Sequence, residues 1–278
     1  MEKKIVFIDV DGTLVGDHGT VPPSAREACI QARKNGHLLY LCTGRSKSEI
    51  YDFIIDVGFD GIIGAGGGFV EVGEETLYHK KFDINDVKEM VEFFRENEIN
   101  FYLESNDGLY GSEKLKDQIE ELLEKVEEEQ REMMRENVNH FVSAMTFTEP
   151  NFYPTDMNKA CFLEPKNITF EKIKEKFSEK FGVIQCTVPM FGENSGEIMI
   201  PNIHKAVAIK ELLEHLGMTK EQTIAIGDGL NDLEMLDFCE IGIAMDNAKQ
   251  ELKDIANHIT DHADNDGLYN SFKKYALI

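Results

Sequence analysis

Short apolar runs that stop abruptly at small or acidic residues constrain the fold of this chain more than any other feature. Four such runs, with the residues that follow them, lie at 4–8 before Asp9, 38–42 before Thr43, 223–226 before Gly227 and 241–245 before Asp246. Continuous runs of this length are typical of parallel strands that are buried on both faces. Segments of helical period separate them. The pattern therefore predicts an α/β fold, with a Rossmann-like core around a central parallel sheet and right-handed crossovers.

The first helical segment carries both a start and a stop signal. Pro22-Pro23-Ser24 opens it, and Ser24 and Glu27 have the spacing of a capping box. Gly36 stands where a glycine commonly ends a helix. These signals predict a helix between the first two strands, started by the Ser24 side chain.

The pattern changes in the middle of the chain. Residues 69–72 and 75–82 resemble the strands of a hairpin rather than a strand followed by a crossover helix. Beyond them, apolar spacing predicts helices near 84–94, 115–126 and 173–181 and strands at 101–104, 183–189 and 197–200. We predict that 83–194 form an inserted, smaller α/β (α+β) cap domain, and that 1–82 and 195–278 form the core. Such an insert would be a movable lid at the edge of the core sheet.

The charge balance restricts the partners that this chain can bind. Lys and Arg number 29 and Asp and Glu number 52, which gives a formal net charge of −23. A chain this acidic repels nucleic acids and anionic membrane surfaces, so we expect neither as a partner. A small phosphorylated ligand is compatible with the charge only if a cation and a local basic residue attract it.

The cysteines and the N-terminus favour a reducing, cytoplasmic location. The five cysteines are odd in number and form no Cys-x-x-Cys pair: Cys29, Cys42, Cys161, Cys186 and Cys239. Cysteines that stand singly within apolar runs are typical of buried thiols. We find no apolar region of signal-peptide form near the start and no stretch of membrane-spanning length.

Three aspartates follow strands of the predicted parallel sheet. Asp9 and Asp11 lie two residues apart after the first strand, and Asp228 follows a later one. Because the carboxyl ends of parallel strands meet at one edge, these carboxylates should converge there. Each aspartate alone would suit a turn or a helix cap. Together they would repel one another without a counter-ion, and hard oxygen ligands suit Mg²⁺, so the sequence predicts a Mg²⁺ site.

These motifs, taken in order, are similar to those of the haloacid dehalogenase-like hydrolases, and more narrowly to the Cof-type phosphatases. The residues that carry the resemblance are Asp9-Val10-Asp11-Gly12-Thr13-Leu14, Thr43-Gly44-Arg45, Lys205, Gly227-Asp228 through Asn231-Asp232, Ala244-Met245-Asp246-Asn247-Ala248 and Asp266-Gly267. The similarity covers about residues 3–270, and the insert matches mainly in size and position. It implies a phosphoric monoester hydrolase.

The resemblance also implies roles for the acidic residues. Asp9 would be the nucleophile, whose carboxylate attacks phosphorus and forms an aspartyl phosphate. Asp11 would protonate the leaving alcohol and then accept a proton from water. Mg²⁺ would bind the carboxylates of Asp9 and Asp228 and the backbone carbonyl of Asp11.

The remaining motif residues would contact phosphate or support those that do. The implied catalytic residues beside the aspartates are Thr43 and Lys205, and the implied phosphate-binding set is Gly12, Thr43, Gly44, Arg45, Lys205 and Asn231. Lys205 begins a predicted helix, where the helix dipole disfavours a cation, and this misfit favours a functional role. Asn231 and Asp232 would orient Asp228, Lys205 or a water, or cap the helix that follows them. Arg45 would reach the substrate or pair with a carboxylate.

Two positions depart from the Cof-type pattern. Residues 64–68, Gly-Ala-Gly-Gly-Gly, supply no side-chain amide where similar proteins usually carry Asn-Gly-Ala, so that Gly66 stands where they have Asn. A hinge or a close backbone approach would explain these glycines. Ala206 stands where a glycine commonly follows the motif lysine, and we expect little consequence.

The sequence therefore predicts a Mg²⁺-dependent phosphatase for a small phosphorylated metabolite, a sugar phosphate or a nucleotide-like monoester. One alternative is a phosphosugar mutase, which shares the aspartyl-phosphate step. Another is a non-catalytic signalling module that is phosphorylated on an aspartate. Asp11 and the large insert argue against the signalling module, because such a module needs neither a general acid nor a lid.

Overall fold

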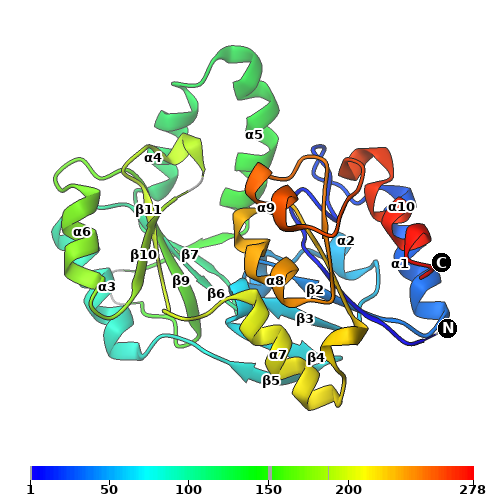
Figure 1. The fold of residues 1–278 in the computed structure, drawn as a ribbon. Coiled ribbons are helices and arrows are strands. Elements are labelled where there is room, and N and C mark those ends of the chain that lie inside the picture. Colours follow the sequence, from blue (N-terminus) through cyan, green and yellow to red (C-terminus); the bar gives the residue numbers. More distant parts are fainter. Residues whose placement is uncertain (1, 150–151, 187) are drawn as a thin grey trace. The chain divides into compact units, whose positions relative to one another are not determined.

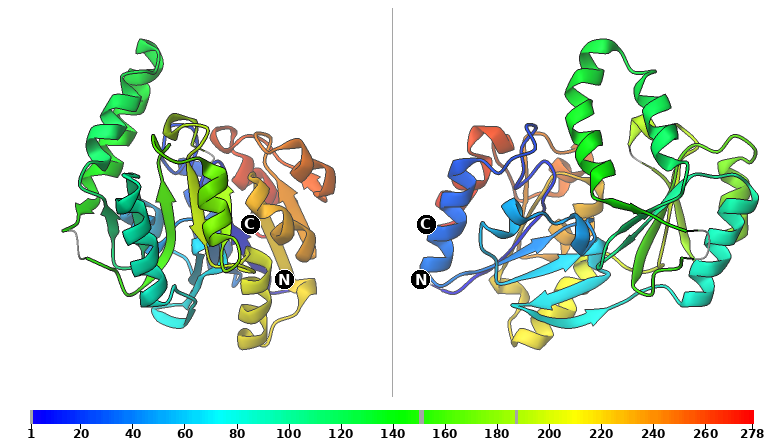
Figure 2. Two further views of the ribbon diagram at one scale, coloured as in Figure 1. Left: turned by 90° about the vertical axis from the view of Figure 1, so that its left-hand side faces the viewer. Right: turned by 180° about the vertical axis from the view of Figure 1, so that it is seen from behind.

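The chain forms two compact units in a computed structural model that describes residues 2–149, 152–186 and 188–278 (Figure 1). The first unit comprises residues 1–45, 50–79 and 203–278, and the second comprises residues 46–49 and 80–202. Figure 2 shows the same ribbon from two further directions. The chain therefore leaves the first unit twice before it returns at Ile203.

An eight-stranded sheet forms the centre of the first unit. Its order is β14 (His258–Ile259), β13 (Ile241–Ala244), β12 (Thr223–Gly227), β1 (Ile5–Ile8), β2 (Leu38–Cys42), β3 (Gly61–Gly64), β4 (Phe69–Val72) and β5 (Glu75–His79). The strands from β14 to β3 are parallel, and β4 and β5 add an antiparallel hairpin at one edge. The predicted α/β class with a central parallel sheet is confirmed.

Helices cover both faces of this sheet because β1 is apolar on both sides. Val6 and Ile8 pack with α1 (Pro23–Lys34), α2 (Asp52–Ile55) and α10 (Gly267–Lys274). The alternate residues, Ile5 and Phe7, pack on the other side with α7 (Lys205–Leu216), α8 (Leu233–Phe238) and α9 (Gln250–Ile255). Burial on both faces is what the continuous apolar runs predict.

The register of the strands gathers the motif loops at one edge. Ile8 pairs with Leu41 of β2 and with Ile226 of β12. The residues that follow these strands are thus neighbours, and the Asp9 N–H donates to the Ile226 carbonyl oxygen over 3.0 Å. The loops after β1, β2 and β12 meet, as expected for parallel strands.

The predicted start of α1 is wrong. The helix begins at Pro23, with Pro22 as the N-cap residue and no side-chain capping bond, and Ser24 lies inside the first turn. Proline at the first helical position has a φ angle that already suits the helix, so no serine cap is needed. Gly36 follows the end of the helix in a left-handed conformation, with φ of +91°. This stop signal is confirmed.

The second unit contains a six-stranded sheet, and four helices of its described residues cover this sheet. The strand order is β10 (Gly182–Gln185), β11 (Gly196–Met199), β9 (Met157–Phe162), β6 (Phe101–Ser105), β7 (Leu109–Gly111) and β8 (Met145–Phe147). One face packs on α3 (Ile84–Glu96) and α6 (Phe170–Phe177), and the other on α4 (Leu115–Leu123) and α5 (Glu128–Ser143). The strand predicted over 183–189 ends earlier, at Gln185, and residue 187 lies outside the described residues.

A short segment after the Arg45 loop belongs to this second unit. Asn158 Nδ2 donates to Ser46 Oγ over 3.1 Å, and Ser48 Oγ donates to the Ser105 carbonyl oxygen over 2.7 Å. Ser46 Oγ in turn donates to Glu104, 3.3 Å away. Residues 46–49 are therefore held by β6, β9 and the turn beside them.

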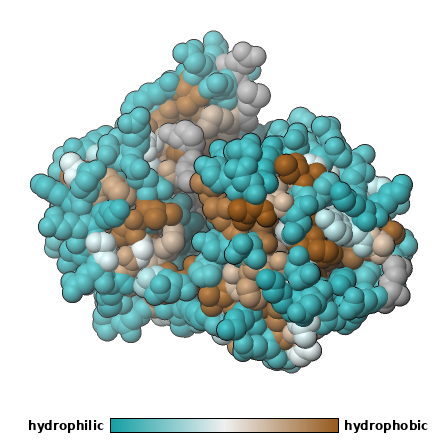
Figure 3. Space-filling model, viewed as in Figure 1, coloured by the Kyte–Doolittle hydropathy of each residue, from teal (hydrophilic) through white to brown (hydrophobic). Residues whose placement is uncertain are grey.

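The surface is largely polar on the face drawn in Figure 3, in keeping with the surplus of acidic residues. Among the described residues, no helix has both the length and the apolar character needed to cross a membrane. The five cysteines are free thiols; four are buried and Cys186 is partly buried.

Candidate active site

A buried lysine lies at the centre of the motif loops. Lys205 is the first residue of α7, and only 1 % of it is exposed. Its Nζ lies 2.5 Å from Oδ1 of Asp9 and 2.5 Å from Oδ1 of Asp232. A cation at a helix N-terminus is disfavoured by the helix dipole. The two carboxylates offset this effect and hold the lysine in place.

Burial and charge act in opposite directions on these groups. Burial alone would lower the pKa of Lys205, but the carboxylates of Asp9 and Asp232 outweigh it and raise that pKa, so the lysine stays a cation. Burial, followed by the negative charge of Asp232, raises the pKa of Asp9. A further positive charge beside Asp9 would favour its ionised form.

Asp232 is fully buried, and both of its carboxylate oxygens accept hydrogen bonds from protein donors. Oδ1 accepts from Lys205, and Oδ2 accepts the N–H groups of Asp228, at 3.1 Å, and Gly229, at 3.0 Å. The alternative that Asp232 caps α8 is wrong, since its side chain makes no capping bond to that helix. Asp232 instead fixes the loop after β12 relative to Lys205.

Asp228 is held between two donors from other loops. Thr13 Oγ1 donates to its Oδ1 over 3.0 Å, and Asn247 Nδ2 donates to its Oδ2 over 3.2 Å. Burial raises the pKa of Asp228 to about 6, although the Thr13 bond opposes the shift. Gly12 passes so close that a Cβ there would lie 2.4 Å from Asp228 Oδ2, and its φ is +76°. Only glycine fits this position.

The acidic residues at this edge suit a divalent cation. Asp9, Asp228 and Asp232 each offer an oxygen, and these atoms all lie within 4.8 Å of one another. Three carboxylates face one lysine, which leaves an excess of negative charge. Asp232 is fully buried and accepts three hydrogen bonds, one of them from the Lys205 ammonium, whereas Asp228 is only partly buried and each of its oxygens accepts one. Asp9 and Asp228 are therefore the better ligands. Carboxylate oxygens are ligands that Mg²⁺ prefers.

Asp11 and Arg45 form an ion pair within the first unit. Arg45 Nε donates to Asp11 Oδ2 over 2.9 Å, and Nη2 donates to Oδ1 over 2.6 Å. The Arg45 guanidinium also lies over the ring of Tyr51, 5.4 Å from its centroid. Of the two expectations for Arg45, the structure has the pairing with a carboxylate.

Some of the expected phosphate-binding groups already form hydrogen bonds within the protein, and others have a donor that binds no backbone carbonyl. The Gly12 N–H donates to the Val15 carbonyl oxygen over 2.9 Å, so it is engaged inside its own loop. Thr43 is buried, and its Oγ1 accepts the Arg45 N–H over 3.1 Å. Within the described part of the chain, the N–H groups of Asp11 and Gly44 donate to no backbone carbonyl.

Asn231 is exposed and lies beside the loop after β2. A Cβ on Gly44 would be 3.5 Å from Asn231 Nδ2. The side chain is thus near Gly44, whereas the neighbouring Asp232 turns into the interior. The two residues that the resemblance groups together therefore differ in their surroundings.

The glycine-rich loop after β3 lies against the start of α7. Gly67 has φ of +108°, and a Cβ there would lie 2.8 Å from the His204 carbonyl oxygen. This is the close backbone approach that the glycines suggest, one residue before Lys205. Gly66 has φ of +64° with no atom near a Cβ, so its need for glycine is conformational alone.

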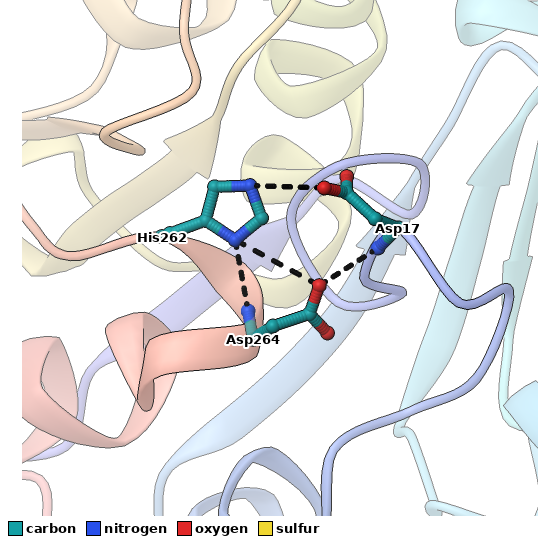
Figure 4. A group of neighbouring side chains, drawn as sticks. All are labelled: Asp17, His262 and Asp264. Carbon is teal, nitrogen blue, oxygen red and sulfur yellow. Dashed lines mark hydrogen bonds and ion pairs between the residues drawn. The ribbon is translucent and has the colours of Figure 1, made fainter.

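A second group of ligand-type side chains lies outside this site (Figure 4). His262 Nδ1 accepts the Asp264 N–H over 3.2 Å, and Nε2 lies 3.5 Å from Asp17 Oδ2. The Asp17 N–H in turn donates to Asp264 Oδ2 over 3.0 Å. The group is held together by its own hydrogen bonds, and it ties the loop at Asp17 to the turn before α10.

Thr13 and Asn247 both bind Asp228, although their motifs alone predict no role for either side chain. Asn247 lies in the loop after β13, at the same sheet edge as the other motifs. Its position after a parallel strand was the one sign in the sequence that Asn247 lies near the site. That it binds Gly12 could not be predicted, because the two loops are far apart in the sequence.

Comparison with known proteins agrees with this geometry. The family profile described as haloacid dehalogenase-like hydrolase matches residues 6–272. The Bacillus subtilis phosphatase YwpJ is 24% identical over 97% of this chain and 99% of its own length. The Bacillus subtilis 5-amino-6-(5-phospho-D-ribitylamino)uracil phosphatase YwtE is 26% identical over 95% of each chain.

A solved structure from Geobacillus kaustophilus shares the fold. It has a TM-score of 0.82 and 24% identity, and the match covers 100% of both chains. The likeness extends through both units, so neither unit is an addition peculiar to this chain. The profile match and these likenesses confirm the resemblance. The chain belongs to the haloacid dehalogenase-like hydrolases, and it is a phosphatase of the Cof type that its motifs resemble.

Proposed function

We propose that this phosphatase is Mg²⁺-dependent and hydrolyses a small phosphorylated metabolite through an aspartyl phosphate on Asp9. One observation carries the proposal: Asp9 and Asp232 share the buried Lys205 beside Asp228. This arrangement supplies a carboxylate nucleophile, a fixed cation and two oxygen ligands within a few ångströms. The excess of negative charge there calls for a divalent ion.

In the first step, an oxygen of Asp9 attacks phosphorus. The new bond joins Asp9 to the phosphoryl group while the ester bond breaks, and Asp11 gives its proton to the departing alkoxide. In the second step, Asp11 takes a proton from water, whose oxygen attacks phosphorus and releases Asp9 as a carboxylate. Lys205 neutralises charge on the phosphoryl oxygens in both steps.

Asp9 and Asp228 would hold Mg²⁺ through their carboxylates, with the backbone carbonyl of Asp11. When bound, the ion supplies positive charge to the phosphoryl oxygens. Asp228 is held for this role by Thr13 and Asn247. A ligand role for the Asp11 backbone carbonyl would leave the Asp11 side chain available for proton transfer.

Arg45 has to release Asp11 before Asp11 can carry a proton. The planar guanidinium can donate two parallel hydrogen bonds to a carboxylate or to two oxygens of a phosphate, so an incoming phosphoryl group can take the place of Asp11. The N–H groups of Asp11 and Gly44 and the hydroxyl of Thr43 would bind further phosphoryl oxygens, and Asn231 lies beside them. Substrate binding would thereby free the general acid.

We place the substrate among phosphorylated metabolites with a polyol or nucleotide-like leaving group. The relative YwtE, which matches 95% of this chain, is a phosphatase for such a compound. Its substrate, 5-amino-6-(5-phospho-D-ribitylamino)uracil, carries a phosphorylated ribityl chain on a uracil ring. The second unit would serve as the cap that selects the leaving group. It contains the expected cap residues 83–194 together with 46–49, 80–82 and 195–202, since β11 pairs within its sheet.

A panel of phosphorylated metabolites, tested with Mg²⁺ and with a chelator, examines the proposal. We expect release of inorganic phosphate in Mg²⁺ and none in the chelator. Asp9→Asn should lower kcat at least about a thousandfold, since the amide cannot attack phosphorus. Full activity of that variant would reject Asp9 as the nucleophile. Isomerised sugar phosphate without free phosphate would identify a mutase instead.

A further inference from the structure

Asn247 lies beside the acidic site and has one polar atom without a partner. Its Nδ2 donates to the Gly12 carbonyl oxygen over 2.9 Å and to Asp228 Oδ2 over 3.2 Å. Its Oδ1 is buried and has no hydrogen-bond partner among the described residues. A buried acceptor without a donor is unfavourable, so this atom points to a donor that is not part of the chain.

The orientation of the amide follows from its neighbours. The Gly12 carbonyl and the Asp228 carboxylate are both acceptors, so only the Nδ2 group can face them. Turning the amide over would place Oδ1 against two acceptors. Oδ1 is bonded to the same carbon as Nδ2, and it therefore stays close to the Asp228 carboxylate.

We propose that Asn247 is a positioning residue for the divalent cation, an inference that rests on the proposed function. Nδ2 fixes Asp228 and the Gly12 loop relative to each other. Oδ1 accepts a hydrogen bond from a water that the cation carries. Mg²⁺ loses its waters reluctantly and usually keeps several, and such waters are strong donors. The residue thus acts on both a metal ligand and the hydration of the metal.

Thr13 provides a comparison within the same site. Its hydroxyl donates to the other oxygen of Asp228 over 3.0 Å. Loss of either donor loosens the carboxylate, but only Asn247 also has the buried Oδ1. Thr13→Val and Asn247→Leu therefore separate the holding of Asp228 from the binding of water.

The test measures Mg²⁺ affinity by calorimetric titration of the full-length chain, without substrate. We expect Asn247→Leu to weaken binding at least about tenfold, the usual effect of losing a residue that supports a metal ligand. Thr13→Val should also weaken Mg²⁺ binding, but its effect should be several-fold smaller than that of Asn247→Leu. Asp246→Asn, on the same loop with a side chain that is 68% exposed, should bind as the wild type does.

Melting temperatures measured in chelator show whether each variant is folded. If Asn247→Leu does not fold, Asn247→Ala replaces it, because it also removes the side-chain amide. Wild-type Mg²⁺ affinity in the Asn247 variants would overturn the proposal, and so would a loss no larger than that of Thr13→Val. If the wild-type chain binds neither Mg²⁺ nor Mn²⁺, the proposed metal fails and the role of Asn247 fails with it. If only the Asn247 variants behave unexpectedly, the proposed function stands.

Discussion

The guanidinium of Arg45 binds the carboxylate of Asp11 through two hydrogen bonds, of 2.9 and 2.6 Å. The Asp11 side chain is 61% exposed, whereas that of Arg45 is 21% exposed. The residue implied as the general acid is thus held by a cation of the neighbouring loop. The pair links the loops after β1 and β2 in the first unit.

Arg45→Lys should lower kcat/KM almost as much as Arg45→Gln does. We expect both to lower kcat/KM about 10- to 100-fold, mainly through KM, because lysine cannot reproduce the two parallel hydrogen bonds of the guanidinium. Steady-state kinetics on one phosphate ester measures this. A lysine variant with wild-type kcat/KM would show that only the charge of Arg45 matters.

Lys205→Met should destabilise the fold as well as abolish turnover. It leaves Asp9 and Asp232 buried without a counter-charge, which we expect to cost about 3–5 kcal/mol of unfolding free energy. Lys210→Met changes an exposed lysine of the same helix and should have little effect. Adding Asp232→Asn to Lys205→Met should recover part of the loss. Denaturant unfolding measures all three, and equal effects of the two single lysine variants would contradict the prediction.

Asp228→Asn should stabilise the metal-free chain while it removes Mg²⁺ binding. Burial raises the pKa of Asp228 to about 6, so the folded chain disfavours the charge. Between about 4 and 6 the folded state binds more protons than the unfolded state, and stability falls as pH rises through this window. Full ionisation should cost about 1–2 kcal/mol at pH 7, after allowance for partial exposure.

Melting in chelator across pH 4–8 measures this effect. The wild type should lose stability toward pH 7 relative to Asp228→Asn, and Asp237→Asn, an exposed change on α8, should follow the wild type. Parallel pH profiles for the wild type and Asp228→Asn would contradict the shift at Asp228.

Gly67→Ala should be far more harmful than Gly66→Ala. Both positions have positive φ, which costs a non-glycine residue about 1–2 kcal/mol. At Gly67, a Cβ would also press on the His204 carbonyl and displace Lys205, so activity should fall with stability. Unfolding and kinetics on both variants measure the difference. Equal effects would show that conformation alone matters in this loop.

Local signals predicted most of the core but only part of the second sheet, since β6, β10 and β11 overlap predicted strands whereas β7, β8 and β9 do not. The strands before Asp9, Thr43 and Gly227 are continuous apolar runs, which predict buried parallel strands with right-handed crossovers. Strand β9 was missed because Lys159 interrupts its apolar pattern. The structure pairs that lysine with Glu104, 3.0 Å away on β6, and such a partner is not visible in a local window.

The sequence was enough to name the motif residues, but it did not determine the role of each one. For Asp232 the sequence left two roles open, orienting Asp228 or Lys205 and capping the next helix, and only the fold shows both oxygens bound to Lys205 and the loop at Asp228. Asn247 was part of a motif without a role. Its bond to Gly12 spans 235 positions of the chain, so no spacing rule could reveal it.

The attachment of Ser46 and Ser48 to Glu104, Ser105 and Asn158 limits how this enzyme can be rebuilt. A chimera that exchanges only 80–202 for the corresponding part of a relative would leave these two serines facing foreign side chains. The unit of modular exchange is therefore discontinuous, and residues 46–49 have to travel with the insert. A graft made on that basis should keep its hydrogen bonds intact where a simple swap would break them.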